Sequence, residues 1–200
     1  MSRQITYLLI ADGGTDRALI PIIDWTIRNI DPEVDILEPD FLKRHGPVKN
    51  YVEGLDSGAM LIFVHRDAEG ETLAERLREF DDVSDQRVIP VIPVRMSESW
   101  LLIDGSAIAA AADRPFAMVT TPAVTTLEGL FDPKSRLEDL LVGATGGLTG
   151  RSLKRFKQSL VDRRIDVSRR IEDYGLLDQL PAFQEFRRRL KDVYPYGGNC

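Results

Sequence analysis

The sequence is poor in cysteine and histidine. Its single cysteine, Cys200, is the last residue, and the chain has only two histidines. One thiol cannot form a disulfide within the chain or a thiolate metal cluster, and such cysteine usage is typical of a reducing compartment. A metal site in this chain therefore has to rely mainly on carboxylate ligands.

Long hydrophobic runs and an excess of positive charge are also missing. No stretch approaches the ~18–20 apolar residues of a membrane-spanning helix, and the first residues lack the features of a signal peptide. The 26 basic and 32 acidic residues give a net charge of −6, which does not suit binding to polyanions over the whole surface. We expect a soluble, cytoplasmic protein without a membrane partner.

Apolar runs typical of buried strands alternate with amphipathic stretches typical of helices through residue 112. The predicted strands are 5–10, 34–37, 59–65 and 88–94. The predicted helices are 15–29, 48–55, 70–82 and 97–103, the last capped by Ser97. This alternation indicates an α/β domain with a mainly parallel sheet flanked by helices. Pro90 and Pro93 indicate that the last strand lies at an edge of the sheet or has a bulged end.

Residues 113–200 are expected to form a mostly helical C-terminal extension packed on the domain of residues 1–112. Residues 113–134 look irregular, and helices are predicted at 135–142, 152–173 and 181–193, with a break at 143–150. Basic residues outnumber acidic ones between Arg151 and Arg170, which indicates either contact with a nucleic-acid backbone or a solvated helix face. Because Phe156 and Tyr174 are the only aromatic residues in this region, stacking on single-stranded bases is not favoured.

Acidic residues follow the first, third and fourth predicted strands. They are Asp12, Asp16, Asp67, Glu69, Glu98 and, further along, Asp104. The carboxyl ends of parallel strands meet at one edge, where ligands bind in open α/β sheets. Carboxylates held close together repel one another unless a cation neutralises them, and oxygen ligands favour Mg²⁺ or Mn²⁺. Alternatively, each acid alone is a helix cap or a solvated turn residue, which suits Asp16.

Four further residues are candidates for binding the phosphate of a substrate. Gly13 and Gly14 permit a sharp turn before a helix N-terminus, which favours an anion, although a plain tight turn explains each glycine equally well. His65 ends the third strand and either contacts phosphate or, as we favour, bonds the backbone. Lys134 either neutralises a phosphate or pairs with the acidic edge.

The motifs at these positions also carry a family resemblance. They are DGGTD at 12–16, HRDAE at 65–69 and PVRMSESWLLID at 93–104, with thinner matches at 132–134 and 180–190. The chain resembles the Toprim domain of topoisomerases, bacterial primases and the overcoming-lysogenization-defect nucleases. It is similar above all to an uncharacterised bacterial Toprim-like family of stand-alone proteins. The resemblance implies a Toprim/Rossmann-like sheet.

The resemblance also implies roles for individual residues. Asp12 takes the position of the Toprim glutamate, a general acid/base, and Asp67 and Glu69 take that of the Asp-x-Asp pair that binds Mg²⁺. Glu98 and Asp104 match the segment Glu-x-Trp-Leu-Leu-x-Asp of the closer relatives. Asp12 in place of glutamate and Glu69 in place of aspartate are departures, which either compensate for each other or mark a decayed site.

Together these features predict Mg²⁺- or Mn²⁺-dependent phosphodiester hydrolysis of nucleic acid. Asp12 and Glu98 would be catalytic, and the metal ligands would be Asp67, Glu69, Glu98 and Asp104. The resemblance implies an anti-phage or DNA-repair setting with an ATPase partner, and a homodimer is left open. The alternatives are a catalytically degenerate scaffold that binds a protein or nucleic acid, and a small-molecule phosphohydrolase.

Overall fold

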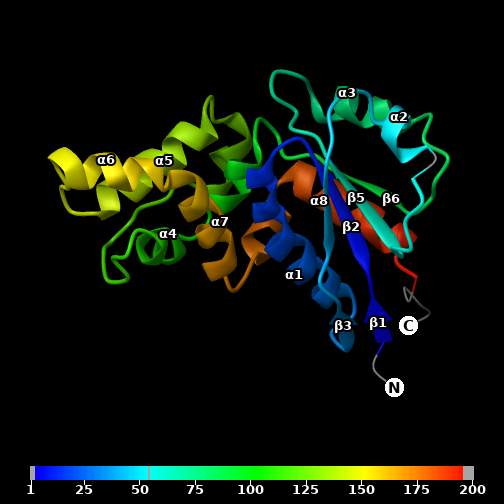
Figure 1. Ribbon diagram of the computed structural model, residues 1–200, viewed down its shortest axis with the longest axis horizontal. Helices are drawn as coiled ribbons and strands as arrows, with labels where there is room; N and C mark the ends of the chain where they lie inside the picture. The colour runs from blue at the N-terminus through cyan, green and yellow to red at the C-terminus, as the bar shows by residue number, and fades with distance from the viewer. Residues whose placement is uncertain (1–2, 54, 196–200) are drawn as a thin grey trace.

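The computed structural model describes residues 3–53 and 55–195 (Figure 1). Cys200, the basis of the prediction about disulfides, lies outside these residues. In the part of the chain that is described, no helix has the length and apolar character needed to cross a bilayer.

Four parallel strands form the main sheet, in the order β4-β2-β5-β6. They are β2 (Tyr7–Ala11), β4 (Asp40–Lys43), β5 (Leu61–His65) and β6 (Val88–Val91). Two short strands, β1 (Arg3–Ile5) and β3 (Val34–Ile36), pair in parallel beside it. The α/β class with a parallel sheet is confirmed. β6 lies at an edge of the sheet, where Pro90 is tolerated because no further strand needs its missing N–H.

Eight α-helices occur in the described residues. They are α1 (Ile20–Ile30), α2 (Lys49–Val52), α3 (Leu73–Leu77), α4 (Gly105–Ala111), α5 (Pro133–Ala144), α6 (Gly150–Gln158), α7 (Leu160–Arg170) and α8 (Pro181–Val193). Figure 1 shows α5, α6 and α7 gathered beside the sheet together with α4. The C-terminal part of the chain is mostly helical, as its sequence predicts.

Helices cover both faces of the sheet because alternate strand residues point to opposite sides. Tyr7 and Leu9 of β2 belong to a buried cluster that includes α1 and α8. Leu8 and Ile10 belong to a second buried cluster beneath α2 and α3. A strand that is apolar on both faces therefore lies in the middle of three layers, as parallel sheets require.

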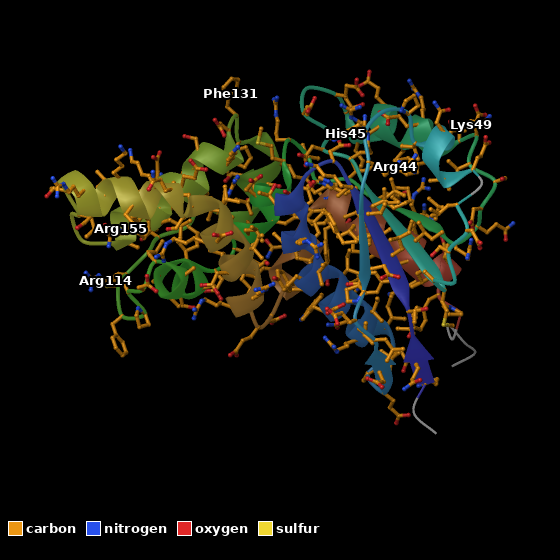
Figure 2. All side chains as sticks on the ribbon, viewed as in Figure 1. Arg44, His45, Lys49, Arg114, Phe131 and Arg155 are labelled. Carbon is orange, nitrogen blue, oxygen red and sulfur yellow. The ribbon has the colours of Figure 1, made fainter. Side chains whose placement is uncertain are left out.

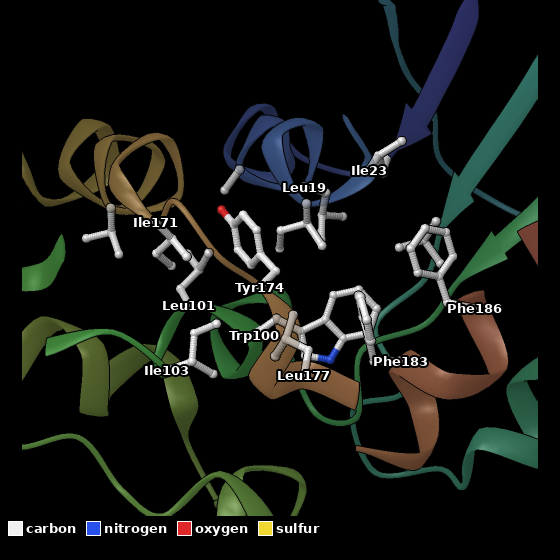
Figure 3. Close-up of a cluster of buried hydrophobic side chains, with 14 of the residues drawn as sticks. Leu19, Ile23, Trp100, Leu101, Ile103, Ile171, Tyr174, Leu177, Phe183 and Phe186 are labelled. Carbon is white, nitrogen blue, oxygen red and sulfur yellow. The ribbon is translucent and has the colours of Figure 1, made fainter. Parts of the chain in front are cut away.

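Aromatic side chains connect the sheet to the C-terminal helices (Figure 3). Phe186 of α8 has its ring centroid 6.0 Å from that of Phe63 in β5. Phe183 meets Trp100 edge-on at 5.4 Å. The last helix thus returns to the sheet, and one buried cluster runs from β2 through Trp100 to α8.

Several predicted elements differ from those observed. The expected helix 15–29 begins as a 3₁₀ helix, Gly14–Leu19, before α1. The expected helix 97–103 is a 3₁₀ helix, Ser97–Leu101, whose N-cap is Met96 and not Ser97. The helix predicted at 152–173 breaks at Ser159, which separates α6 from α7 and donates its hydroxyl to the Phe156 carbonyl.

The structure contains several elements that the sequence analysis did not predict, and three of them have a clear physical reason. β4 is half-exposed and contains charged residues, so its sequence does not show the apolar run of a buried strand. The region expected to be irregular at 113–134 contains a 3₁₀ helix, Val124–Gly129. The third is α4, whose N-cap is Asp104: its carboxylate accepts hydrogen bonds from the backbone N–H groups of Ser106 and Ala107, at 2.8 and 3.1 Å.

The start of α4 depends on the absence of a side chain at Gly105. A Cβ at this position would lie 2.1 Å from the Val119 carbonyl oxygen. We expect Gly105→Ala to lower the free energy of unfolding by about 1–3 kcal/mol, because backbone has to move. Gly143→Ala in α5, where a Cβ meets open space, should instead raise it by about 0.5 kcal/mol. Urea denaturation of both variants measures the difference, and equal effects would contradict the close approach at Gly105.

Candidate functional site

The candidate residues lie at the carboxyl edge of the main sheet. β4, which follows β2 in the main sheet, pairs with one side of β2, and the next strand, β5, pairs with the other side. The order in which strands are added to the sheet therefore reverses at β2. In open α/β sheets the ligand-binding crevice lies at such a change in strand order. The neighbouring strands β2, β5 and β6 bring their following acids to this edge, as their sequence pattern predicts.

A buried histidine lies between two carboxylates at this edge. His65 is 2% exposed, its Nε2 lies 3.0 Å from Asp67 Oδ1, and its Nδ1 lies 3.5 Å from Asp16 Oδ2. Burial disfavours the charged ring, but Asp67 and Asp16 outweigh burial and raise the pKa of His65 to about 10. The ring is therefore an imidazolium at neutral pH. It bonds the Asp67 carboxylate where we expected a bond to the backbone, and its Nδ1 makes an ion pair with Asp16 without a hydrogen bond.

Asp16 is held in place by the turn that follows β2. Its Oδ2 accepts a hydrogen bond from the Gly13 N–H at 2.8 Å, which is the capping role that its position predicts. A Cβ at Gly13 would lie 3.4 Å from the same oxygen, which is close to an ordinary van der Waals contact, so the turn does not depend on a glycine at this position. Burial opposes ionisation of Asp16, but His65 and the Gly13 N–H lower its pKa overall. The contact of Asp16 with His65 had no signal in the sequence.

A second buried ion pair joins the edge of the sheet to α7. Arg164 Nη1 lies 2.5 Å from Glu98 Oε1 and 3.9 Å from a Glu138 carboxylate oxygen. Both Glu98 and Arg164 are buried. Burial raises the pKa of Glu98, and the negative charge of Asp67 raises it further, although Arg164 lowers it. Asp67 is thus close enough to Glu98 to affect the pKa of the buried Glu98 carboxyl.

Asp12 lies in a separate and more open ion-pair network. Its carboxylate is 45% exposed and accepts a hydrogen bond from Arg66 Nη1 at 3.2 Å. Arg66 also contacts Glu79 through Nε at 3.1 Å. The exposed His45, whose position is shown in Figure 2, has its Nδ1 4.0 Å from the other Asp12 oxygen. Arg66 therefore fixes the direction of the Asp12 side chain at the rim of the site.

The other predicted residues are not gathered with this group by any described contact. Glu69 is 72% exposed and lies 3.7 Å from Arg76, and its φ of 53° is left-handed. Asp104 is the cap of α4, with all its hydrogen bonds directed to that helix. Lys134 is exposed in the first turn of α5, and Gly14 begins the 3₁₀ helix after β2. Their proposed functional roles stay predictions.

Asp67 and Glu98 are the carboxylates whose chemistry fits a divalent ion best. In each, one oxygen is bound to a cationic side chain, His65 or Arg164, and Asp67 is partly exposed. Among the residues that the structure describes, no three acid or histidine side chains form a ready-made metal cage. Mg²⁺ usually binds to one or two carboxylates and completes its shell with water and substrate phosphate, so two protein ligands are sufficient.

A cavity of about 600 Å³ lies elsewhere, between α1 and the end of α7. Its walls include Trp25, Arg28 and Arg169, and none of the candidate acids lines it. The carboxyl edge is thus separate from this cavity.

No protein-family model, curated protein or solved structure matches this chain. The resemblance to Toprim domains therefore rests on the motifs at residues 12–16, 65–69 and 93–104. Any functional conclusion has to come from the geometry and chemistry of the carboxyl edge.

Proposed function

We propose that this chain hydrolyses phosphodiester bonds of nucleic acid with the help of Mg²⁺ or Mn²⁺. The observation that carries the proposal is the convergence of two acids that follow the adjacent strands β5 and β6: Asp67 lies near enough to Glu98 to raise the pKa of Glu98. Each is buried or half-buried, and each is held in place by a buried cation. This arrangement suits a site that binds a divalent ion between fixed oxygens.

The side chains around the edge have distinct roles in the proposal. Asp67 and Glu98 would hold the ion, which when bound supplies positive charge to the phosphate. Asp12, fixed by Arg66, would accept a proton from the water that attacks phosphorus, while the departing oxygen takes a proton from solvent. His65 would act as a positioning residue, because it orients Asp67 without reaching the open rim itself.

A scaffold without catalytic activity is the second candidate function. It is favoured by the finding that Asp12, Asp67 and Glu98 each have a cationic partner within the chain. Such acids are already neutralised and do not need a metal ion for stability. A scaffold of this kind would bind a protein or nucleic acid. The ATPase partner that the resemblance implies, and a homodimer, also stay predictions.

Isosteric substitutions of the two acids test the enzymatic proposal. Asp67→Asn and Glu98→Gln should each reduce cleavage of labelled single-stranded DNA and RNA by about 100-fold, since they remove charge where the ion binds. The matched control is Asp40→Asn, an exposed aspartate at the start of β4, on the opposite edge of the sheet. Thermal melting of each variant shows that it is folded.

The same assay separates the two candidate functions. Cleavage that requires Mg²⁺ or Mn²⁺ and is retained by Asp40→Asn supports the enzyme. Equal residual cleavage in the wild-type protein and in both site variants would identify a contaminating nuclease and remove the proposal.

A further inference from the structure

Two helices in the C-terminal part each carry four basic residues but differ in the acidic partners of these residues. α6 carries Arg151, Lys154, Arg155 and Lys157, and α8 carries Arg187, Arg188, Arg189 and Lys191. α8 also contains Glu185 and Asp192, whereas α6 contains no acidic residue. Their ion pairs distinguish them.

The arginines of α8 are neutralised within the chain. Arg188 contacts Glu185 and Asp192, at 2.8 and 2.7 Å, and Arg189 contacts Glu185 at 2.6 Å. Arg187 pairs with Asp178. These charges stabilise the surface of α8 and attract little from outside, because each is already matched by a carboxylate.

The cations of α6 have no such partners. No acidic residue occurs between Asp139 and Asp162, and the described residues include no ion pair to any α6 cation. Phe156 and Leu160 bury the opposite side of this segment against the core. The charged side chains are therefore exposed on one broad face, and Arg151, Lys154 and Arg155 follow the spacing of neighbours on a helix.

An exposed aromatic side chain lies beside the end of α5, the helix that precedes α6 in the chain. Phe116 is 98% exposed, and it shares a shallow pocket of about 410 Å³ with Ala144 and Thr145 at the end of α5. Arg114 Nε donates to the Thr145 carbonyl at 3.4 Å. Figure 2 shows Arg114 and Arg155 at the same end of the molecule.

The exposed ring of Phe116 offers a surface on which a base of a single strand can stack. Phe156 and Tyr174, the aromatic residues of the basic region, are both buried and cannot stack on bases. Phe116 comes from an earlier loop, and its ring is fully available. Cations along a helix with an exposed ring beside them match the combination that binds single-stranded nucleic acid, in which phosphates meet the cations and a base stacks on the ring.

We infer that α6, together with Arg114 and Phe116, binds single-stranded nucleic acid. We call these residues the α6 surface: Arg114, Phe116, Arg151, Lys154, Arg155 and Lys157. The inference rests on the proposed function in one respect: the proposed function is the reason to expect nucleic acid, and not another polyanion, as the ligand of this surface. α6 leads directly into α7, whose Arg164 contacts Glu98, so a strand on this surface lies next to the helix that borders the carboxyl edge.

Binding is measured in chelator, so that neither metal nor cleavage enters the result. Fluorescence anisotropy with labelled oligonucleotides compares Lys154→Gln/Arg155→Gln with Arg188→Gln/Arg189→Gln, two changes of equal charge on adjacent helix positions. The α6 variant should bind single strands about 5- to 20-fold more weakly. Its salt slope should fall by about 1.4, because each phosphate that a cation neutralises adds about 0.7 to the slope. The α8 variant should change affinity less than about twofold.

Phe116→Ala tests the aromatic contact separately. It should weaken binding to single strands at least about fivefold and leave duplex binding unchanged. Wild-type affinity in the α6 variant, or an equal reduction of affinity in the α8 variant, would overturn the inference. An equal effect of Phe116→Ala on duplex and single strand would overturn the assignment to single strands. If the wild-type protein binds single strands as expected but shows no metal-dependent cleavage, the proposed function is wrong and the inference about the α6 surface still holds.

Discussion

Replacing Arg164 with methionine is expected to lower the free energy of unfolding by about 3–5 kcal/mol. Arg164 is buried and contacts Glu98, which is buried as well. Without the guanidinium, Glu98 either remains charged in a poorly solvated place or takes up a proton. In either case a buried polar group has lost its partner, which destabilises the folded state. Urea denaturation at neutral pH measures the resulting change in the free energy of unfolding.

A matched control and a rescue make this expectation specific. Arg170 lies on the same helix and pairs with Asp166, but its side chain is 44% exposed. Arg170→Met should therefore change stability by less than about 0.5 kcal/mol. Adding Glu98→Leu to Arg164→Met should recover much of the stability, since buried pairs can often be replaced by apolar residues. A small effect of Arg164→Met alone would mean that the pair is not buried as described.

Stability should decrease as the pH rises above neutral, because of His65. The pKa of His65 is about 10 in the folded chain and about 6.5 in an unfolded one. Because the folded value is the higher one, the stabilisation is fully present below pH ~6.5 and is lost as the pH rises towards 10. In this window the folded state holds one more proton, so the free energy of unfolding should fall by about 1.4 kcal/mol per pH unit.

The variant His65→Gln identifies the group responsible. It cannot carry a charge between Asp16 and Asp67, so its stability at neutral pH should be lower by a few kcal/mol. The steep fall between about pH 7 and 9.5 should disappear from its urea-denaturation series. A wild-type protein whose stability stays constant over this range would show that the ring is not an imidazolium between two carboxylates.

Local patterns in the sequence predict the layers of the fold and the edge at which the acids lie. The strand at residues 61–65 is buried on both faces, and its continuous apolar sequence is sufficient to predict it without knowledge of its neighbours in the fold. Pro90 and Pro93 predict an edge strand because proline lacks the N–H that a central strand needs. The acids after β2, β5 and β6 reach one edge because parallel strands share their direction.

The partners of those acids could not be predicted in the same way. Arg164 meets Glu98 across 66 residues of sequence, and nothing near either residue indicates the pairing. Ion pairs between distant segments depend on how the helices pack. The role of Asp104 did have a local signal, since Asp-Gly-Ser-Ala is a typical helix start, but the same aspartate also matches the motif of the Toprim-like relatives, which favoured metal binding instead.

Calorimetric titration with Mn²⁺ and Mg²⁺ tests most directly whether Asp67 and Glu98 share a divalent ion. The wild-type protein and Asp40→Asn should bind one ion, whereas Asp67→Asn and Glu98→Gln should show little or no heat of binding. An absence of binding in the wild-type protein, or equal binding in all four proteins, would contradict a metal site at this edge and favour the scaffold.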